Sequence, residues 1–425
     1  MLLVISQFLH AKSSAIQSVF YQLPSIHTVR LTPSDSWKQQ YIYDLDTNSN
    51  LDILLSFDEL FADSRQLYFS LYHCDVNWLR DDMLSIEYWD GFEKQYDCSE
   101  YSLSFNTTVE YVHYSVRIPI NRFKTSGNFV VNVYSIEDDE LLLSRPIIIA
   151  EHGLGIASNV KKTNLDGTQE LSLALSSTSS LSPEYLTENF VVGAWQNTDL
   201  SSFRTFTSPT AIRANGLSYT SPLVFSAGSE WRWADSRSLR GHVMSNTHVT
   251  MTDGYYNAYI PLTQLPLGYS YHEDFNGLQY IHSYDSPNTN YDITADYSIV
   301  NINFLFPQGL IGDYSKLYVV GDFVDAPFPT ERTAISPEVQ YIVSDGERLP
   351  VFKFTYFVKQ SLANYRIVEV DDNGNINMEN TESNFSETEN DYHICAYYRD
   401  QSTGYYRLLA YKRHNTLKTP NAFIP

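Results

Sequence analysis

Positively charged side chains are scarce in this chain. Its 425 residues include 28 Lys and Arg against 50 Asp and Glu, which gives a formal net charge of -22. Recognition of a nucleic-acid backbone depends on clustered basic side chains, and so does attachment to anionic lipid. The charge balance therefore excludes a nucleic-acid-binding protein and argues against direct attachment to an anionic membrane.

Cysteine is scarcer still, with three in the whole chain. Cys74, Cys98 and Cys395 cannot form a disulfide framework, and no CxxC pair suggests a zinc or redox site. Two interpretations stay open. The three are small buried apolar side chains, or Cys74 and Cys98 form one bridge inside one domain.

Long apolar runs are missing as well. Beyond the first few residues, no window approaches the ~18 uninterrupted apolar residues that a membrane-spanning helix needs. The run from Met1 to Leu9 is similar to the apolar part of a secretory signal, with Ser13 and Ala15 as small residues before a cleavage point. No basic residue precedes Lys12. Residues 1–15 are thus either the remnant of a signal peptide or an apolar first strand.

Aromatic and apolar residues are abundant. The chain has 33 Tyr, 23 Phe and 6 Trp, and its hydrophobic fraction of 43% is too high for a disordered acidic chain. Residues 68–72 and 109–118 alternate with a period of two, as strands with one buried face do. Turn signals every 8–12 residues favour antiparallel sandwiches over alternating strands and helices. We therefore expect an all-β protein made of tandem antiparallel, immunoglobulin-like β-sandwich domains.

Three such domains are expected after residues 1–15. Residues 16–150 form an N-terminal sandwich, residues 151–290 a middle β-rich domain, and residues 291–425 a C-terminal immunoglobulin-like sandwich. The polar, glycine-containing stretch 151–175 is typical of a linker. Residues 371–390 are acidic and rich in Asn, which predicts an exposed loop.

Motifs for chemistry are absent or incomplete. No GxSxG, HExxH or P-loop sequence occurs. Five oxygen-bearing side chains alternate like ligands of a calcium loop: Asp44, Asp46, Asn48, Asn50 and Asp52. Ser49 and Leu55 stand where an EF-hand needs Gly and Glu, so a polar hairpin between residues 41–43 and 51–55 is the better interpretation.

His73 and Cys74 place an imidazole beside a thiol. Neighbours in a strand point to opposite faces, so His73 is not placed to activate Cys74 as a nucleophile. The sequence therefore assigns no catalytic, cofactor-binding or metal-binding residue, and we expect no enzyme and no cofactor.

Two features of residues 231–240 could serve a ligand or a partner. Trp231 and Trp233 share one face if this segment is a strand, and flat rings can stack on sugars. The alternative is that the aromatic residues form the sandwich cores. Charged residues surround the tryptophans: Arg232, Asp235, Arg237 and Arg240. They form either an internal salt-bridge network or a contact with a partner.

The order of several short segments resembles a known family. These segments are Leu71–Trp78 with its His73-Cys74 pair, Glu87–Phe92, Tyr111–Tyr114, Ser126–Phe129, Phe225–Arg240, and Glu389–Tyr392 with Ala396–Arg399. They closely resemble the HC-x-x-x-W, E-Y-x-x-G-F, Y-x-H-Y, S-G-N-Y, R-S-L-R and E-N-D-Y patterns of the type IX secretion system plug protein family, formerly a domain of unknown function from Bacteroidetes. The resemblance runs from about Ile26 to Tyr411. Ser229, Trp231, Trp233 and Phe129 depart from the pattern by substitutions of similar size or polarity.

The resemblance implies a non-enzymatic periplasmic subunit. Members of this family are understood to close the periplasmic opening of the outer-membrane translocon barrel while it is idle. The expected partner is that barrel protein, the expected location is the periplasm beside the outer membrane, and no direct membrane insertion is expected. The residues that contact the partner are not assigned by the sequence. A carbohydrate-binding β-sandwich protein of the cell envelope is the alternative.

Overall fold

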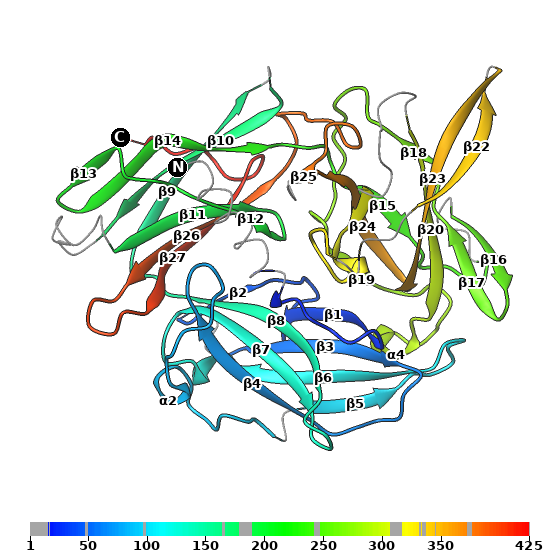
Figure 1. Cartoon of the computed structure of the whole chain (residues 1–425), viewed down its shortest axis with the longest axis horizontal. Coiled ribbons are helices and arrows are strands. Elements are labelled where there is room, and N and C mark those ends of the chain that lie inside the picture. The colour runs from blue at the N-terminus through cyan, green and yellow to red at the C-terminus, as the bar shows by residue number, and fades with distance from the viewer. Residues whose placement is uncertain are drawn as a thin grey trace.

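Three β-sandwiches make up the protein, and Figure 1 shows them as three groups of strands. The computed structural model describes residues 16, 18–46, 50–96, 99–163, 166–177, 189–241, 247–306, 317–330, 333, 337–344, 346–371 and 376–424. The expected signal peptide at residues 1–15 lies outside this part of the chain. No helix among the described residues is long and apolar enough to cross a membrane.

The first sandwich contains the strands that precede residue 151. One sheet has the order β1 (Ile26–Pro33), β3 (Asp52–Leu60), β6 (Tyr111–Pro119) and β5 (Ser99–Leu103). The facing sheet has the order β2 (Ile42–Asp44), β8 (Leu141–Ala150), β7 (Gly127–Ser135) and β4 (Leu67–Cys74). Two short helical turns, α2 (Ser85–Tyr88) and η1 (Ile120–Arg122), lie between strands.

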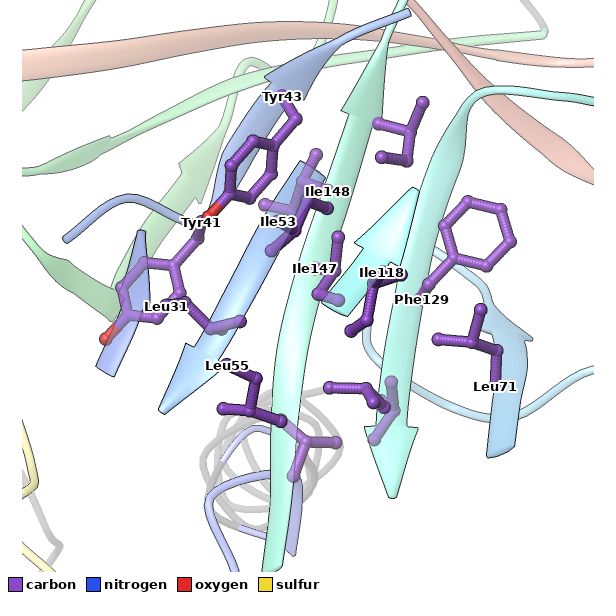
Figure 2. Close-up of a cluster of buried hydrophobic side chains, with 14 of the residues drawn as sticks. Leu31, Tyr41, Tyr43, Ile53, Leu55, Leu71, Ile118, Phe129, Ile147 and Ile148 are labelled. Carbon is purple, nitrogen blue, oxygen red and sulfur yellow. The ribbon is translucent and has the colours of Figure 1, made fainter. Parts of the chain in front are cut away.

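Alternation along these strands fills the space between the two sheets. Figure 2 shows Ile53, Ile118, Phe129 and Ile147 meeting there, and each of them is 0% exposed. Because successive side chains in a strand point to opposite faces, one apolar residue in two is enough to build this core.

The second sandwich combines residues 155–226 with the C-terminal strands. One sheet has the order β13 (Ala211–Arg213), β14 (Gly216–Ser226), β10 (Thr168–Ser176) and β9 (Gly155–Thr163). The other has the order β12 (Asp199–Thr205), β11 (Phe190–Gln196), β26 (Asp391–Arg399) and β27 (Tyr406–Asn415). The expected linker at 151–175 is wrong: β9 and most of β10 occupy it, because Val160, Leu171 and Leu173 supply buried side chains.

The third sandwich lies between β14 and β26 in the sequence. One sheet has the order β15 (Arg232–Asp235), β24 (Ser361–Val370) and β19 (Gln279–Ile281), with β21 (Leu317–Val320) and β25 (Ile376–Asn377) also paired to β24. The other has the order β16 (His248–Thr252), β17 (Tyr255–Tyr259), β20 (Tyr297–Leu305), β23 (Glu347–Lys359) and β22 (Glu338–Ser344), with β18 (Thr263–Gln264) on β20. The turns α4 (Tyr291–Thr294) and η3 (Asp322–Val324) flank it.

The all-β class is therefore confirmed, and the immunoglobulin-like detail stays a prediction. Most strand pairs are antiparallel, but β2 with β8, and β17 and β18 with β20, are parallel. The expected boundaries at 150 and 290 also stay predictions. Since β11 pairs with β26, strands from both sides of residue 290 share one sheet. We propose that the third sandwich is an insertion in the second.

Two local expectations, the hairpin at 41–55 and the exposed loop at 371–390, are wrong because contacts distant in the sequence decide both. Residues 41–55 are not a hairpin, because β2 pairs with β8 in one sheet of the first sandwich while β3 pairs with β1 and β6 in the other. The segment 371–390 is not simply an exposed loop, because Thr381, Glu382 and Asn390 are each 0% exposed. Polar residues there form hydrogen bonds with distant parts of the chain, which sequence pattern alone does not show.

Candidate partner-binding surface

Motif residues of the first sandwich hold it against the second. The His73 ring is buried, with Nδ1 2.6 Å from Asp81 Oδ2 and Nε2 3.1 Å from the Tyr406 carbonyl oxygen on β27. Gly127 has a φ of 140°, and a Cβ there would collide with His73 Nε2. Only glycine accepts both this backbone conformation and this close approach without strain. The histidine and the glycine of the motif pattern thus serve one contact between sandwiches.

Cys74 occupies the other face of the same strand. It is 0% exposed, and burial raises the pKa of its thiol above the usual range. A thiol held protonated inside a core is a poor nucleophile, so His73 and Cys74 do not form a catalytic pair. Cys74 and Cys395 are both buried free thiols. The expectation of a bridge from Cys74 involves Cys98, which lies outside the described residues.

An apolar surface completes the contact between the first and second sandwiches. Trp195, Leu200, Tyr397 and Leu408, from the second sandwich, pack into the same apolar cluster as the core of the first. The Trp195 ring stacks on His393 with centroids 5.1 Å apart. The single core that runs through both sandwiches joins them by burial of apolar area.

A buried charged network joins the first sandwich to the third. Asp58 on β3 accepts hydrogen bonds from Lys359 Nζ at 2.6 Å and the Tyr297 hydroxyl at 2.7 Å, and its other oxygen lies 2.7 Å from His113 Nδ1. Both Asp58 and Lys359 are 1% exposed at their side chains. Burial raises the pKa of Asp58, but Lys359 and His113 outweigh burial and bring it below its usual value. The histidine of the Tyr111–Tyr114 motif thus orients a buried carboxylate at the interface.

The charged residues around Trp231 form internal salt bridges. Arg232 Nε lies 3.0 Å from Glu382, whose side chain is 0% exposed, and Arg237 lies 2.7 Å from Asp235. Arg240 lies 3.7 Å from Asp296 and also donates to the Asn106 carbonyl oxygen of the first sandwich. These contacts agree with the internal-network interpretation. The sequence could not name Glu382 as the partner, because 150 residues separate it from Arg232.

The two tryptophans do not offer a sugar platform in this arrangement. Trp231 is 3% exposed, and the Arg366 guanidinium covers its ring at 4.3 Å. Trp233 packs edge-on against Phe275 with centroids 4.9 Å apart. A ring that is already covered by protein cannot stack on a ligand, so Trp231 cannot form half of such a platform.

The calcium-like alternation also forms no ligand set among the described residues. Asn48 lies outside them, and Asp44 accepts a hydrogen bond from the Asp46 backbone N–H at 2.9 Å. In the described ranges no three His, Cys, Asp or Glu side chains are grouped so that they could hold a metal ion.

The segment around α2 presents large apolar side chains to solvent. Leu79, Leu84, Ile86 and Phe92 have exposed fractions of 58%, 65%, 71% and 83%. Figure 1 places α2 at one end of the first sandwich, below β27 of the second. In the sequence, the one sign of this surface is the motif segment Glu87–Phe92. Strand alternation does not explain a motif that lies in a loop, so such a motif can mark a functional surface. The molecule is thus a multidomain β-sandwich protein with large apolar side chains exposed around α2.

Comparison with known families identifies the first sandwich. Residues 26–151 match the family described as "Type 9 secretion system plug protein 1st domain". This match supports the type IX secretion system plug protein family that the motif pattern implied, over the first sandwich.

A solved structure supports the fold over nearly the whole chain. A hypothetical protein from Parabacteroides merdae ATCC 43184, known from a crystal structure, is 22% identical. The similarity covers 93% of this chain and 99% of that one, with a TM-score of 0.81. At that identity, the likeness concerns the fold alone. No curated protein matches the chain.

Proposed function

We propose that this protein is a non-enzymatic periplasmic subunit that closes the periplasmic opening of the type IX outer-membrane translocon while the translocon is idle. The observation that carries the proposal is the family match over residues 26–151. An open pore wide enough for folded proteins would leak, so a folded body must cover it between transport events.

The way the sandwiches are joined supports this role. The first sandwich contacts the second through a continuous apolar core and the third through the buried Asp58–Lys359 pair. Such contacts favour one arrangement of the three bodies without any bound ligand. Release would then follow from differential affinity: the plug binds the idle translocon more tightly than the engaged one.

Co-purification tests the proposal directly. The full-length protein, tagged and expressed in its own host, should co-purify with the translocon barrel protein from detergent-solubilised outer membranes. The yield should fall when the translocon is loaded with substrate. Deletion of the gene should increase the permeability of the envelope to solutes that an open barrel would admit. Absence of the barrel protein from the purified material in both the idle and the loaded state would refute the proposal.

A further inference from the structure

We infer that the segment Leu79–Phe92, which we call the α2 loop, is the surface that docks on the translocon. The inference rests on the proposed function and names the contact. It commits to a partner of stated chemistry: a groove with apolar walls, bordered by basic side chains, on the periplasmic side of the barrel. Four large apolar side chains exposed within 14 residues of one loop mark an interaction site, whereas scattered single ones do not.

The α2 loop is held firmly although its apolar side chains are exposed. The Tyr88 hydroxyl donates to the Leu71 carbonyl oxygen at 2.7 Å, and Trp89 is 2% exposed between the rings of Phe69 and Phe123. The Asp90 N–H donates to the Arg122 carbonyl oxygen at 2.8 Å. Little conformational entropy is then lost when Ile86 and Phe92 enter a groove, which is the advantage of a preorganised binding surface.

The charge of the α2 loop indicates which kind of partner surface it binds. Arg80 is its one basic residue, against the four carboxylates of Asp81, Asp82, Glu87 and Asp90, so the loop has a net charge of -3. A second copy of this chain would bring the same negative loop against it, and an anionic lipid surface would repel it in the same way. A basic rim around an apolar groove is the complementary partner.

A shallow hollow beside the loop offers a place for a partner side chain. It encloses about 260 Å³ on the outer face of β4 and β7, and Tyr68, Tyr72, Tyr134 and Arg80 line it. The Arg80 guanidinium covers the Tyr72 ring at 5.0 Å. Tyr and Arg are enriched among the residues that dominate binding energy at interfaces. The hollow adjoins the loop through Arg80, which belongs to the loop, and Glu93, which directly follows it.

A double variant of the full-length protein tests the inference. Ile86→Glu with Phe92→Glu places two charges on exposed positions, so the fold and the unfolding midpoint should stay unchanged while affinity for the purified translocon barrel falls at least tenfold. Leu267→Glu is the matched control, because Leu267 is 91% exposed and lies on the third sandwich. Its affinity should stay within twofold of the wild type.

Photo-cross-linking removes the dependence on a folded variant. A photoreactive residue at position 86 of the otherwise unchanged chain should cross-link to the barrel protein, and one at position 267 should not. If wild-type protein binds the barrel but the double variant binds equally well, or if position 86 gives no cross-link, the docking surface is wrong and the proposed function stands. If the wild type binds no barrel protein, both the docking surface and the proposed function are wrong.

Charge reversal by Asp90→Lys with Glu93→Lys should weaken binding several-fold and reduce its dependence on salt.

Discussion

The first sandwich contacts its two neighbours through different kinds of side chains. Toward the second sandwich it shares an apolar core that includes Trp195 and Leu408. Toward the third it has a smaller apolar cluster, in which Tyr111 packs against Tyr297, and beside it the buried pair of Asp58 and Lys359. Apolar contacts tolerate small displacements because they have no preferred direction, whereas a buried ion pair is favourable only in one geometry. We call the contact with the second sandwich the apolar interface and the contact with the third, whose ion pair fixes the orientation, the charged interface.

The largest effect should come from breaking the charged interface at one partner. Lys359→Met leaves the Asp58 carboxylate buried without its cation, and removing one member of a buried pair costs about 3–5 kcal/mol of unfolding free energy. Urea unfolding of the full chain measures this loss. Adding Asp58→Leu should recover much of it, because a buried pair replaced by apolar residues is often neutral. A double variant that stays as unstable as the single one would show that the pair is not the source of the effect.

A somewhat smaller effect is expected at the apolar interface. Leu408 is 0% exposed in the shared core, and Leu408→Ala should cost about 3 kcal/mol through lost burial and the cavity left behind. Leu417→Ala is the matched control, because Leu417 is 48% exposed. Equal losses in urea unfolding for the two variants would contradict the role of Leu408 in joining the sandwiches.

Acidification should weaken the apolar interface first. Burial lowers the pKa of His393, which stacks on Trp195, to about 4. An unfolded histidine binds its proton near pH 6.5, so the stability that neutral His393 contributes is present above pH 6.5 and is lost as the pH falls toward 4. We expect a loss of about 3 kcal/mol over this range. His393→Gln cannot titrate and should flatten the slope of unfolding free energy against pH between 4 and 6.5. An unchanged slope would contradict the assignment.

The charged interface should respond only at lower pH, and by less. Burial raises the pKa of Asp292, but Arg30, 2.6 Å away, and the nearby cations outweigh it and bring the pKa to about 2. Since the folded pKa is depressed, its contribution is present above about pH 4 and is lost between pH 4 and 2. The Asp292 side chain is 46% exposed, so solvent screening limits the contribution to about 1 kcal/mol. Asp292→Asn should remove this part of the acid transition, and 0.5 M salt should reduce it in the wild type.

Local pattern predicted what depends on neighbours in the sequence. The alternation in residues 109–118 predicted β6, and the Ser126-Gly127 turn signal predicted the start of β7. It failed at residues 41–55, where β2 and β3 enter different sheets, and at Glu382, whose burial depends on Arg232. A carboxylate in an acidic, Asn-rich stretch looks solvated until a distant cation comes within reach.

The candidate surface was only partly visible in the sequence. Phe92 stands in a motif segment, but nothing local distinguishes it from a core aromatic such as Phe129. The structure leaves Phe92 83% exposed and Phe129 0% exposed. The reason is that Trp89 and Tyr88 fill the space under the loop, so its remaining apolar residues have no interior to enter.

By itself, the sequence determined the all-β class, because strand alternation depends on neighbouring residues, and its motif segments carried the resemblance to the plug family. Tertiary structure alone decided which strands share a sheet, where the charged residues pair and which apolar residues stay outside. Asp58 and Lys359 are 301 positions apart, and β11 meets β26 across the whole third sandwich. Such pairings depend on which surfaces can be buried together once the sheets have formed, and no local periodicity encodes that.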